Sequence, residues 1–311
     1  MNKILHLAAS PIEEISSDLC QNRGIRLFIK RDDLLHPAVS GNKWRKLYYN
    51  LQAAKEQEKK TLVTFGGAYS NHIHAVAAAG HLIGFQTIGL IRGEEPKKYG
   101  ATLAFAKLCG MSFRFLSRSV YREKTLPVDL DLADCYILPE GGTNDLAITG
   151  CGDIVKELLE QLPVATSIHY CVSCGTGGTI TGIINALEGR HQVIGFSALK
   201  GDFMKSEITS LQKEYQLTAY TNWTVNCDYH FGGYAKHKKG LLDFMIKFYK
   251  ETGVALDPVY TGKMIYGVLD LVAKDYFPKG SNIVMIHTGG LQGILGFNER
   301  FGVELPGGIS G

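Results

Sequence analysis

Two lysines stand where a turn leads into an amphipathic segment in the stretch SGNKWRKLYYNL, residues 40–51. Gly41 and Asn42 suit the turn, and Lys43 and Lys46 fall at the start of the helix predicted to follow. A cation is disfavoured there because a helix N-terminus already carries partial positive charge. A lysine amine forms a Schiff base with an aldehyde if it can be kept deprotonated. The stretch therefore indicates either a chemical lysine with a lowered pKa or an ordinary solvated side chain.

Glycine-rich loops follow several strand-like runs, and each opens a helical pattern. They are TFGGAYSNHIHAVAAAG (64–80), SCGTGGTITG (173–182), DPVYTGKMIYG (257–267) and HTGGLQG (287–293). Glycines at such turns leave backbone N–H groups free to bind an anion, and the helix N-terminus adds positive charge. Alone, residues 173–182 also suit a tight turn without a ligand. Together the loops predict a site for a phosphorylated cofactor, and pyridoxal 5′-phosphate adds the aldehyde that a lysine needs.

Other readings of these motifs have less support in the sequence. No Gly-Lys-Ser/Thr follows the loop 173–182, so a nucleotide P-loop in its usual form is excluded. A dehydrogenase would need an acidic residue about 20 residues further on, and VIGFSALKG offers none. Ser70 and Asn71 fall where a helix N-cap would sit. His72 and His74 are two apart and lie on different helix faces, so no metal site is predicted.

Composition limits the class of protein. The 311 residues are 45% apolar and carry a net charge of +3 without a basic stripe, so nucleic acid is not an expected partner. No apolar run reaches the length of a membrane span, so a membrane is not expected either. The start, residues 1–10, has too short an apolar stretch for a signal peptide. Seven irregularly spaced cysteines favour a reducing cytoplasm. Cys171 and Cys174 have a redox spacing but lie in an apolar run, which favours two packed thiols.

Strand-like and helical patterns alternate along the chain. The strand-like runs are 25–30, 61–65, 86–91, 112–116, 135–139, 168–172, 192–199 and 282–287, and helical patterns cover 44–51, 153–161, 241–251 and 264–276. This alternation predicts an α/β fold with parallel sheets covered on both faces. Boundaries near residues 48 and 150 would make the segment between them a separate lobe.

The motifs SGNKWRKL, GGAYSNH, GTGGT, DPVYTGK and HTGG occur in a distinctive order. In this order the chain resembles the 1-aminocyclopropane-1-carboxylate deaminase / D-cysteine desulfhydrase family of tryptophan-synthase-β-like, fold type II pyridoxal-phosphate enzymes. The resemblance runs from KRDDLLH to HTGG. It implies two open, twisted, mostly parallel sheets flanked by helices, with the cofactor in the cleft between two domains. The larger domain would comprise residues 1–48 and 150–311, and the smaller one 49–149.

The resemblance also implies roles for single residues. Lys43 would carry the cofactor, with Lys46 as a structural helper, and Ser70 and Tyr260 would be catalytic. The residues implied at the cofactor are Lys43, Asn71, Gly175, Thr176, Gly177, Gly178, Thr179, Thr261 and Thr288. Those implied at the substrate are Ser70, Asn71, His72, Tyr234 and Tyr260, with a surface position as the alternative for Tyr234.

Several positions bear on which substrate the protein accepts. The deaminases resemble Asp-Pro-Val-Tyr-Glu-Gly and His-Leu-Gly-Gly, whereas this chain has Thr261 and Thr288 at the corresponding places. A neutral hydroxyl is a weaker partner for the pyridine nitrogen than a carboxylate, which favours the desulfhydrase version. Tyr69, His72 and His74 depart from the family's usual residues beside the substrate.

The expected activity is a pyridoxal-phosphate-dependent α,β-elimination. Lys43 or a base near it removes the α-proton of a small amino acid, the β-substituent leaves, and hydrolysis gives ammonia and a keto acid such as pyruvate. D-cysteine would also give sulfide, and the implied enzyme classes are lyase and hydrolase. The alternatives are 1-aminocyclopropane-1-carboxylate deaminase, D-serine ammonia-lyase and a non-catalytic phosphometabolite-binding protein. Relatives suggest a homodimer.

Overall fold

Two mostly parallel sheets form the framework of the computed structural model, which describes residues 7–162 and 167–308. The larger sheet has the order β1 (Ile12–Ile15), β2 (Arg26–Lys30), β10 (Asn282–Ile286), β7 (Ile168–Cys174), β8 (Gln192–Ser197) and β9 (Trp223–Asn226). The smaller sheet has the order β5 (Ser112–Leu116), β4 (Gln86–Arg92), β3 (Thr61–Gly66) and β6 (Cys135–Leu138). Among the strands in the described part of the chain, only β1 runs antiparallel to its neighbour. The predicted α/β fold is confirmed.

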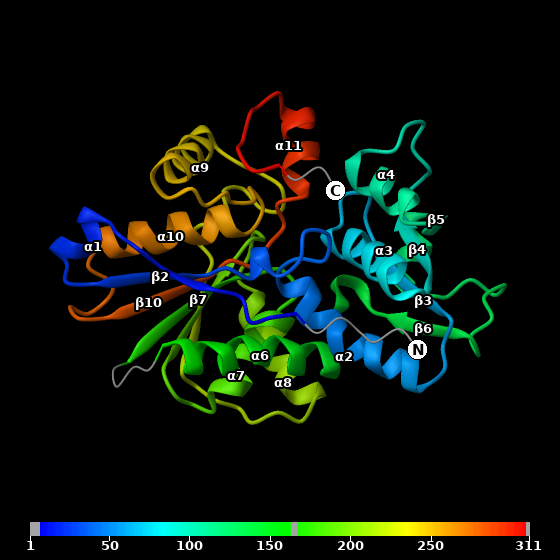
Figure 1. The fold of residues 1–311 in the computed structure, drawn as a ribbon, viewed down its shortest axis with the longest axis horizontal. Helices are drawn as coiled ribbons and strands as arrows, with labels where there is room; N and C mark the ends of the chain where they lie inside the picture. The colour runs from blue at the N-terminus through cyan, green and yellow to red at the C-terminus, as the bar shows by residue number, and fades with distance from the viewer. Residues whose placement is uncertain (1–6, 163–166, 309–311) are drawn as a thin grey trace.

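Helices cover both faces of the larger sheet (Figure 1). One face carries α1 (Asp18–Asn22), α9 (Lys239–Thr252) and α10 (Thr261–Ala273), and the other carries α6 (Asp145–Gln161), α7 (Gly178–Leu187) and α8 (Met204–Glu214). Side chains of β10 alternate between the two layers: Ile283 and Met285 join one apolar cluster, and Val284 and Ile286 join the other. Because both faces of β10 are buried, its sequence is a nearly continuous apolar run.

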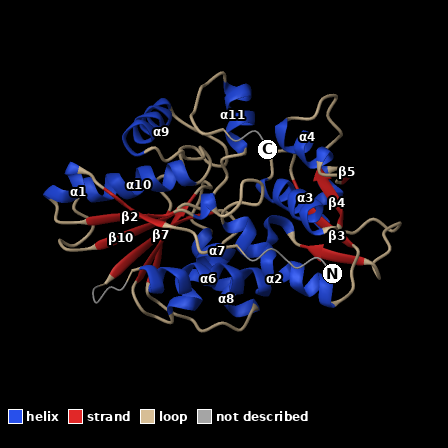
Figure 2. Ribbon diagram, in the orientation of Figure 1, coloured by secondary structure: helices blue, strands red, loops and turns tan. Residues whose placement is uncertain are grey.

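The smaller sheet lies beside the larger one and has its own helices (Figure 2). They are α2 (Asn42–Glu56), α3 (Asn71–Ile83), α4 (Ala101–Leu108) and α5 (Arg118–Glu123). Helix α11 (Gly293–Phe301) lies near α4. Two short 3-10 turns, η1 (Asp32–Leu34) and η2 (Glu140–Gly142), precede α2 and α6. Leu47 and Leu51 of α2 are fully buried in the apolar cluster of this smaller sheet.

Each strand-like run predicted from the sequence corresponds to an observed strand, whereas β1 and β9 were not predicted. Both are four-residue edge strands, and short edges carry little of the apolar pattern that identifies a strand. The predicted domain boundaries at 48 and 150 fall inside α2 and α6, so that division stays a proposal. Residues 1–6 lie outside the described residues. They belong to the segment 1–10, whose apolar stretch was predicted to be too short for a signal peptide. Within residues 7–162 and 167–308, no helix is long and apolar enough to cross a membrane.

A buried ionic network fixes the start of α2. Arg45 donates from Nε and Nη2 to the two carboxylate oxygens of Asp32 at 3.0 and 2.9 Å. The same guanidinium binds Glu157 of α6, whose carboxylate also accepts from Lys30 of β2 at 2.6 Å. Asp32 is fully buried and Arg45 is 6% exposed. The network therefore joins η1, α2, α6 and the larger sheet, two residues after Lys43.

Two glycines let α2 approach its neighbours. Gly41, the N-cap of α2, has φ of +63°, and a Cβ there would collide with the carbonyl oxygen of Thr288. A Cβ on Gly150 of α6 would collide with the carbonyl oxygen of Arg45. The start of α2 is therefore pressed against the loop after β10 on one side and against α6 on another.

We predict that Arg45→Met destabilises the protein by about 3 kcal/mol or more, because it leaves the buried Asp32 carboxylate without its partner. Urea unfolding of the variant and wild type measures the difference. Arg190→Met is the control, since Arg190 pairs with Glu188 on the exposed surface and such pairs contribute about 0–1 kcal/mol. Equal effects of the two substitutions would contradict the role given to the network.

Candidate active site

A cavity of about 660 Å³ lies where the carboxyl ends of the parallel strands of both sheets meet. Open α/β sheets bind ligands at such strand ends. Its lining includes most of the residues predicted from the sequence: Lys43, Ser70, Asn71, His72, Gly175, Thr176, Gly177, Thr179, Tyr234, Tyr260 and Thr288. Gly178 and Thr261 do not line it. The glycine-rich loops therefore converge, as expected.

Lys43 and Lys46 enter the cavity from the first turns of α2. Burial and the nearby charge of Lys46 lower the pKa of Lys43 to about 7, so much of this amine is uncharged at neutral pH. Lys46 is 2% exposed and donates to the Gly141 carbonyl at 3.1 Å and to the Thr143 hydroxyl at 2.9 Å. Burial also lowers the pKa of Lys46, but its donor contacts are already made. The Lys43 amine donates to the same Gly141 carbonyl at a longer distance, 3.4 Å, so Lys43 is the lysine more available for chemistry.

The loop after β3 presents Ser70 and His72. Ser70 is the N-cap of α3, and its hydroxyl oxygen accepts from the backbone N–H groups of His72 and Ile73 at 3.2 and 3.3 Å. Its O–H therefore stays available as a donor toward the cavity. His72 is 1% exposed, and neither ring nitrogen has a hydrogen-bond partner among the residues that the structure describes. Burial and the charges of Lys43 and Lys46 hold the His72 pKa well below its usual value, so the ring is neutral. An unpartnered buried imidazole at a cavity indicates a group that binds there.

His74, the other histidine of this stretch, packs against a neighbouring helix. Its ring stacks on Phe105 of α4 with centroids 4.0 Å apart, and burial lowers its pKa to about 4. It is outside the cavity lining, whereas Tyr69 lies in it and is 54% exposed. Of the three departures from the family's usual residues, Tyr69 and His72 line the cavity and His74 does not.

The loop between β7 and α7 is a set of hydrogen-bond donors. Gly177 is the N-cap of α7 in the left-handed region, with φ of +76°, and no side chain caps the helix. The first N–H groups of an uncapped helix are free to bind an anion. Thr176 and Thr179 line the cavity beside them, and Asn42 donates to the Thr179 hydroxyl at 3.0 Å. With Lys46 nearby, this group of donors fits a phosphate.

Tyr260 closes another side of the cavity. Asp257 accepts from the backbone N–H groups of Tyr260 and Thr261 and from the Thr261 hydroxyl, all at 2.8 Å. A Cβ on Gly175 would lie 3.1 Å from the Tyr260 ring, and Tyr234 packs edge-on against that ring with centroids 6.3 Å apart. Burial raises the pKa of Tyr260 well above its ordinary value, so the phenol stays protonated. Thr261 supports this turn from outside the cavity.

Thr288 meets the cavity from the loop after β10. It is 7% exposed, and its hydroxyl lies 3.3 Å from that of Ser173 at the end of β7. Two neutral hydroxyls therefore occur together at this wall. Cys171 and Cys174 of the same strand are buried and free, as the sequence predicted for packed thiols.

The sequence-based prediction omitted several lining residues, among them Asn42, Arg92, Arg118, Glu140, Gly141 and Ser173. For Glu140 and Gly141 the sequence does carry a signal. LPEGGT, residues 138–143, is another strand followed by two glycines, and Gly141 and Gly142 both have positive φ. Within the described part of the chain, no group of His, Cys, Asp and Glu could hold a metal ion.

Comparisons with known proteins agree with this site. The sequence pattern of the family described as pyridoxal-phosphate dependent enzyme matches residues 5–289. The chain is 34% identical over 304 residues to the Arabidopsis thaliana protein named bifunctional D-cysteine desulfhydrase/1-aminocyclopropane-1-carboxylate deaminase, mitochondrial, covering 87% of this chain and 74% of that protein. It is 29% identical over 313 residues to a putative 1-aminocyclopropane-1-carboxylate deaminase of Pyrococcus horikoshii, covering 94% and 92%. These names support the lyase class and give no support for the predicted hydrolase class.

Solved structures give the same result for the fold. A crystal structure of an ACC deaminase homologue superimposes with a TM-score of 0.80 at 27% identity, covering 94% of this chain and 93% of that chain. A fungal L-serine ammonia-lyase from Rhizomucor miehei gives 0.68 at 15% identity, covering 95% and 99%, which shows the shared fold alone. The cofactor predicted from the sequence, pyridoxal 5′-phosphate, is confirmed by the family.

We predict that the Lys43 amine reacts with pyridoxal as a group with a pKa of about 7. The initial rate of visible absorbance change should rise with pH through about 7 and then level off, because only the uncharged amine attacks an aldehyde. Pyridoxal lacks the phosphate, so the rate reports the amine itself. In Lys46→Met the midpoint should move to higher pH, since a neighbouring positive charge is removed. A rate that keeps rising toward the ordinary lysine value of 10.5 in wild type would contradict the lowered pKa.

Proposed function

The chain belongs to the pyridoxal-phosphate-dependent enzyme family, and on this premise we propose that it is a D-cysteine desulfhydrase-like lyase. Its reaction is an α,β-elimination on a small amino acid, which for D-cysteine gives pyruvate, ammonia and sulfide. The observation that carries the proposal is a lysine with a pKa of about 7, Lys43, at the same cavity as an uncapped helix N-terminus. A reactive amine and a phosphate site are the two features that this cofactor needs.

The residues that would hold the cofactor come from two helices. Thr176, Thr179 and the first N–H groups of α7 would bind the phosphate, with Lys46 adding a positive charge. Gly178, although outside the lining, supplies one of these N–H groups as the first residue of α7. Lys43 would bond the aldehyde carbon. When bound, the cofactor supplies an electron sink for the charge left at the α-carbon.

Ser70 and Asn71 would bind the substrate carboxylate. The Ser70 oxygen accepts from two backbone N–H groups, so its own proton can be donated to a carboxylate. The N-terminus of α3 favours negative charge at that position. His72 would contact the bound molecules through ring nitrogens that have no partner within residues 7–162 and 167–308. The substrate's α-carbon would then lie within reach of Lys43.

Lys43 would act as the base and Tyr260 as the acid in the proton transfers. An amine with a pKa of about 7 can accept the α-proton at neutral pH. Burial keeps Tyr260 protonated, so it can donate to the departing β-substituent but is a poor base. Tyr234 packs against Tyr260 and would narrow the space on the substrate side.

Thr288 would face the pyridine nitrogen of the cofactor, with Ser173 beside it. A neutral hydroxyl does not hold that nitrogen protonated as a carboxylate would. This favours elimination of a good leaving group over opening of a cyclopropane ring. Thr261 would act indirectly, since its hydroxyl is bonded to Asp257 and supports the Tyr260 turn.

The second candidate function is 1-aminocyclopropane-1-carboxylate deamination. It is favoured by the name of the Pyrococcus horikoshii relative and by the TM-score of 0.80 with the ACC deaminase homologue. A homodimer and a cytoplasmic location also belong to this proposal. The seven free cysteines support the location, and light scattering of the purified protein would measure the mass of the assembly.

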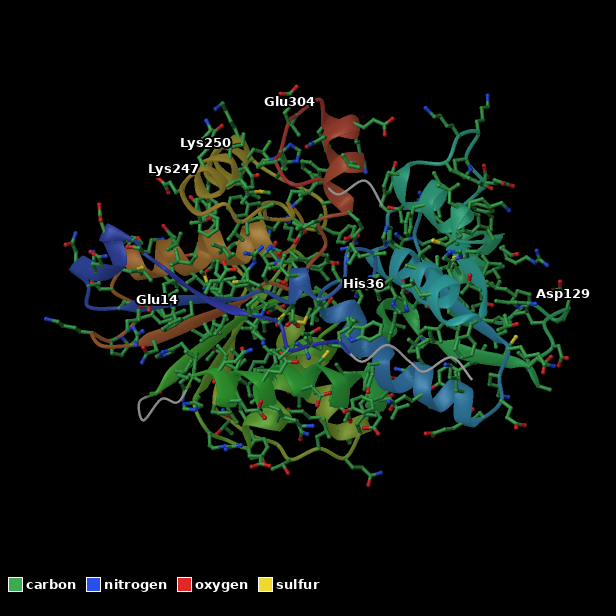
Figure 3. The ribbon with its side chains drawn as sticks, in the orientation of Figure 1. Glu14, His36, Asp129, Lys247, Lys250 and Glu304 are labelled. Carbon is green, nitrogen blue, oxygen red and sulfur yellow. The ribbon has the colours of Figure 1, made fainter. Side chains whose placement is uncertain are left out.

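We predict that D-cysteine is consumed faster than D-serine, and D-serine faster than 1-aminocyclopropane-1-carboxylate. Lys43→Ala should lower kcat by about 10³-fold or more, because it removes both the cofactor bond and the base. The keto acid formed from each compound is the measurement. Lys250→Ala is the matched control, since Lys250 lies on the outer side of α9 (Figure 3). Undiminished turnover in Lys43→Ala would refute the proposed function.

A further inference from the structure

A second cavity of about 590 Å³ adjoins the mouth of the active site. It is lined by Arg92, Arg118, Tyr121, Arg122, Lys124 and Glu140. Arg92, Arg118 and Glu140 line the active-site cavity as well. The two cavities are therefore adjacent and share these three side chains.

The topology of the smaller sheet brings these side chains together. Arg92 is the last residue of β4, Arg118 follows β5 by two residues, and Glu140 follows β6 by two residues. The strands are parallel, so these positions lie at one edge of the sheet, as does the Gly66–Gly67 turn that leads to Ser70. Ligands bind at this edge in open α/β sheets.

Positive charge exceeds negative charge in the lining of the second cavity. Among the described residues that line it, Glu140 is the one carboxylate. It already pairs with Lys124 and accepts from the Tyr121 hydroxyl at 2.7 Å. Arg92 lies over the Tyr121 ring at 5.8 Å. Within residues 7–162 and 167–308, neither Arg92, Arg118 nor Arg122 has an ion pair or a side-chain hydrogen bond.

Arg92 interacts with the Tyr121 ring, and its charge helps to lower the pKa of Glu140. Three guanidinium groups around one space nevertheless repel one another, and one carboxylate does not balance their charge. Their combined field attracts an anion. The planar guanidinium donates two parallel hydrogen bonds to a carboxylate, sulfonate or phosphate. In the proposed function the substrate's α-carboxylate is bound by Ser70 and the N-terminus of α3, and neither Ser70 nor Asn71 lines the second cavity. The arginines therefore fit a second anionic group.

We propose that Arg92, Arg118 and Arg122 form an anion subsite, and that the preferred substrate is a small amino acid whose β-substituent carries a second negative charge. This inference rests on the proposed function, since it assigns the substrate class of the same site. The leaving group would be an anion such as phosphate, held by the arginines as its bond to the β-carbon breaks.

The elimination balances for such a substrate. With O-phosphoserine, the Cα–H bond and the Cβ–O bond break, and phosphate departs with the electron pair of the Cβ–O bond. The product then takes up one water and releases ammonia. O-phosphoserine and water give pyruvate, ammonia and phosphate, with no oxidant or reductant.

The test compares O-phosphoserine with serine, both as D and L enantiomers, in wild type and in the double variant Arg92→Gln/Arg118→Gln. For the enantiomer that reacts, wild type should show the higher kcat/KM with the phosphorylated compound. The double variant should reduce that preference by roughly 10- to 100-fold, as expected for loss of charge-assisted hydrogen bonds. Arg114→Gln is the control: Arg114 pairs with Asp129 at 3.6 Å, and Asp129 lies at the outer edge of the small-sheet side (Figure 3).

A second measurement does not depend on turnover. Inorganic phosphate is titrated into the holoenzyme by calorimetry, where the cofactor fills the α7 phosphate site. Wild type and Arg114→Gln should bind phosphate, and the double variant should bind at least tenfold more weakly. Equal binding by all three, or a substrate preference unchanged in the double variant, would overturn the subsite. Arginine-dependent phosphate binding without elimination of any amino acid would overturn the proposed function and leave the subsite standing.

Discussion

The buried Arg45 guanidinium fixes the position of α2, and the whole site depends on this constraint. Arg45 binds Asp32 before the helix and Glu157 on α6, which fixes α2 to the larger sheet. Leu47 and Leu51 of the same helix are buried in the core of the smaller sheet. One helix thus belongs to both halves of the molecule. Its first turn, with Lys43, must lie where the halves meet, and both sheets direct their carboxyl ends there.

The chemistry of the cavity follows from its distribution of charge. Lys43 has a pKa of about 7 because it is buried beside a second lysine, and the neighbouring His72 is neutral for the same reasons. The wall formed by Ser173 and Thr288 is neutral. Lys46 near the α7 loop and the arginines at the outer mouth can bind the anionic groups of bound molecules. A cavity with this distribution supplies a base and binds phosphate, which is what the cofactor chemistry of the family needs.

The sequence predicts the central strands and the loops after them well, because strands buried on both faces are continuous apolar runs that end at glycines. Lys43 was identifiable from its motif. Thr261 illustrates a limit: its motif places it beside the cofactor, but its hydroxyl is bonded to Asp257, a contact that spacing alone does not reveal. Arg92 and Arg118 illustrate a second limit of sequence-based prediction. In the sequence, arginines at strand ends are indistinguishable from solvated surface residues, and only the topology shows that they lie at one edge of the sheet. The edge strands β1 and β9 were too short to recognise.

The most direct test of the central claim is to locate the cofactor on the chain. The holoenzyme would be reduced with borohydride, digested, and analysed by mass spectrometry for the lysine that carries the pyridoxyl group. The account predicts the label on Lys43, within the peptide that also contains Lys46, and fragmentation distinguishes the two. A label on Lys46, or on any lysine outside α2, would contradict the assignment of Lys43 as the reactive amine.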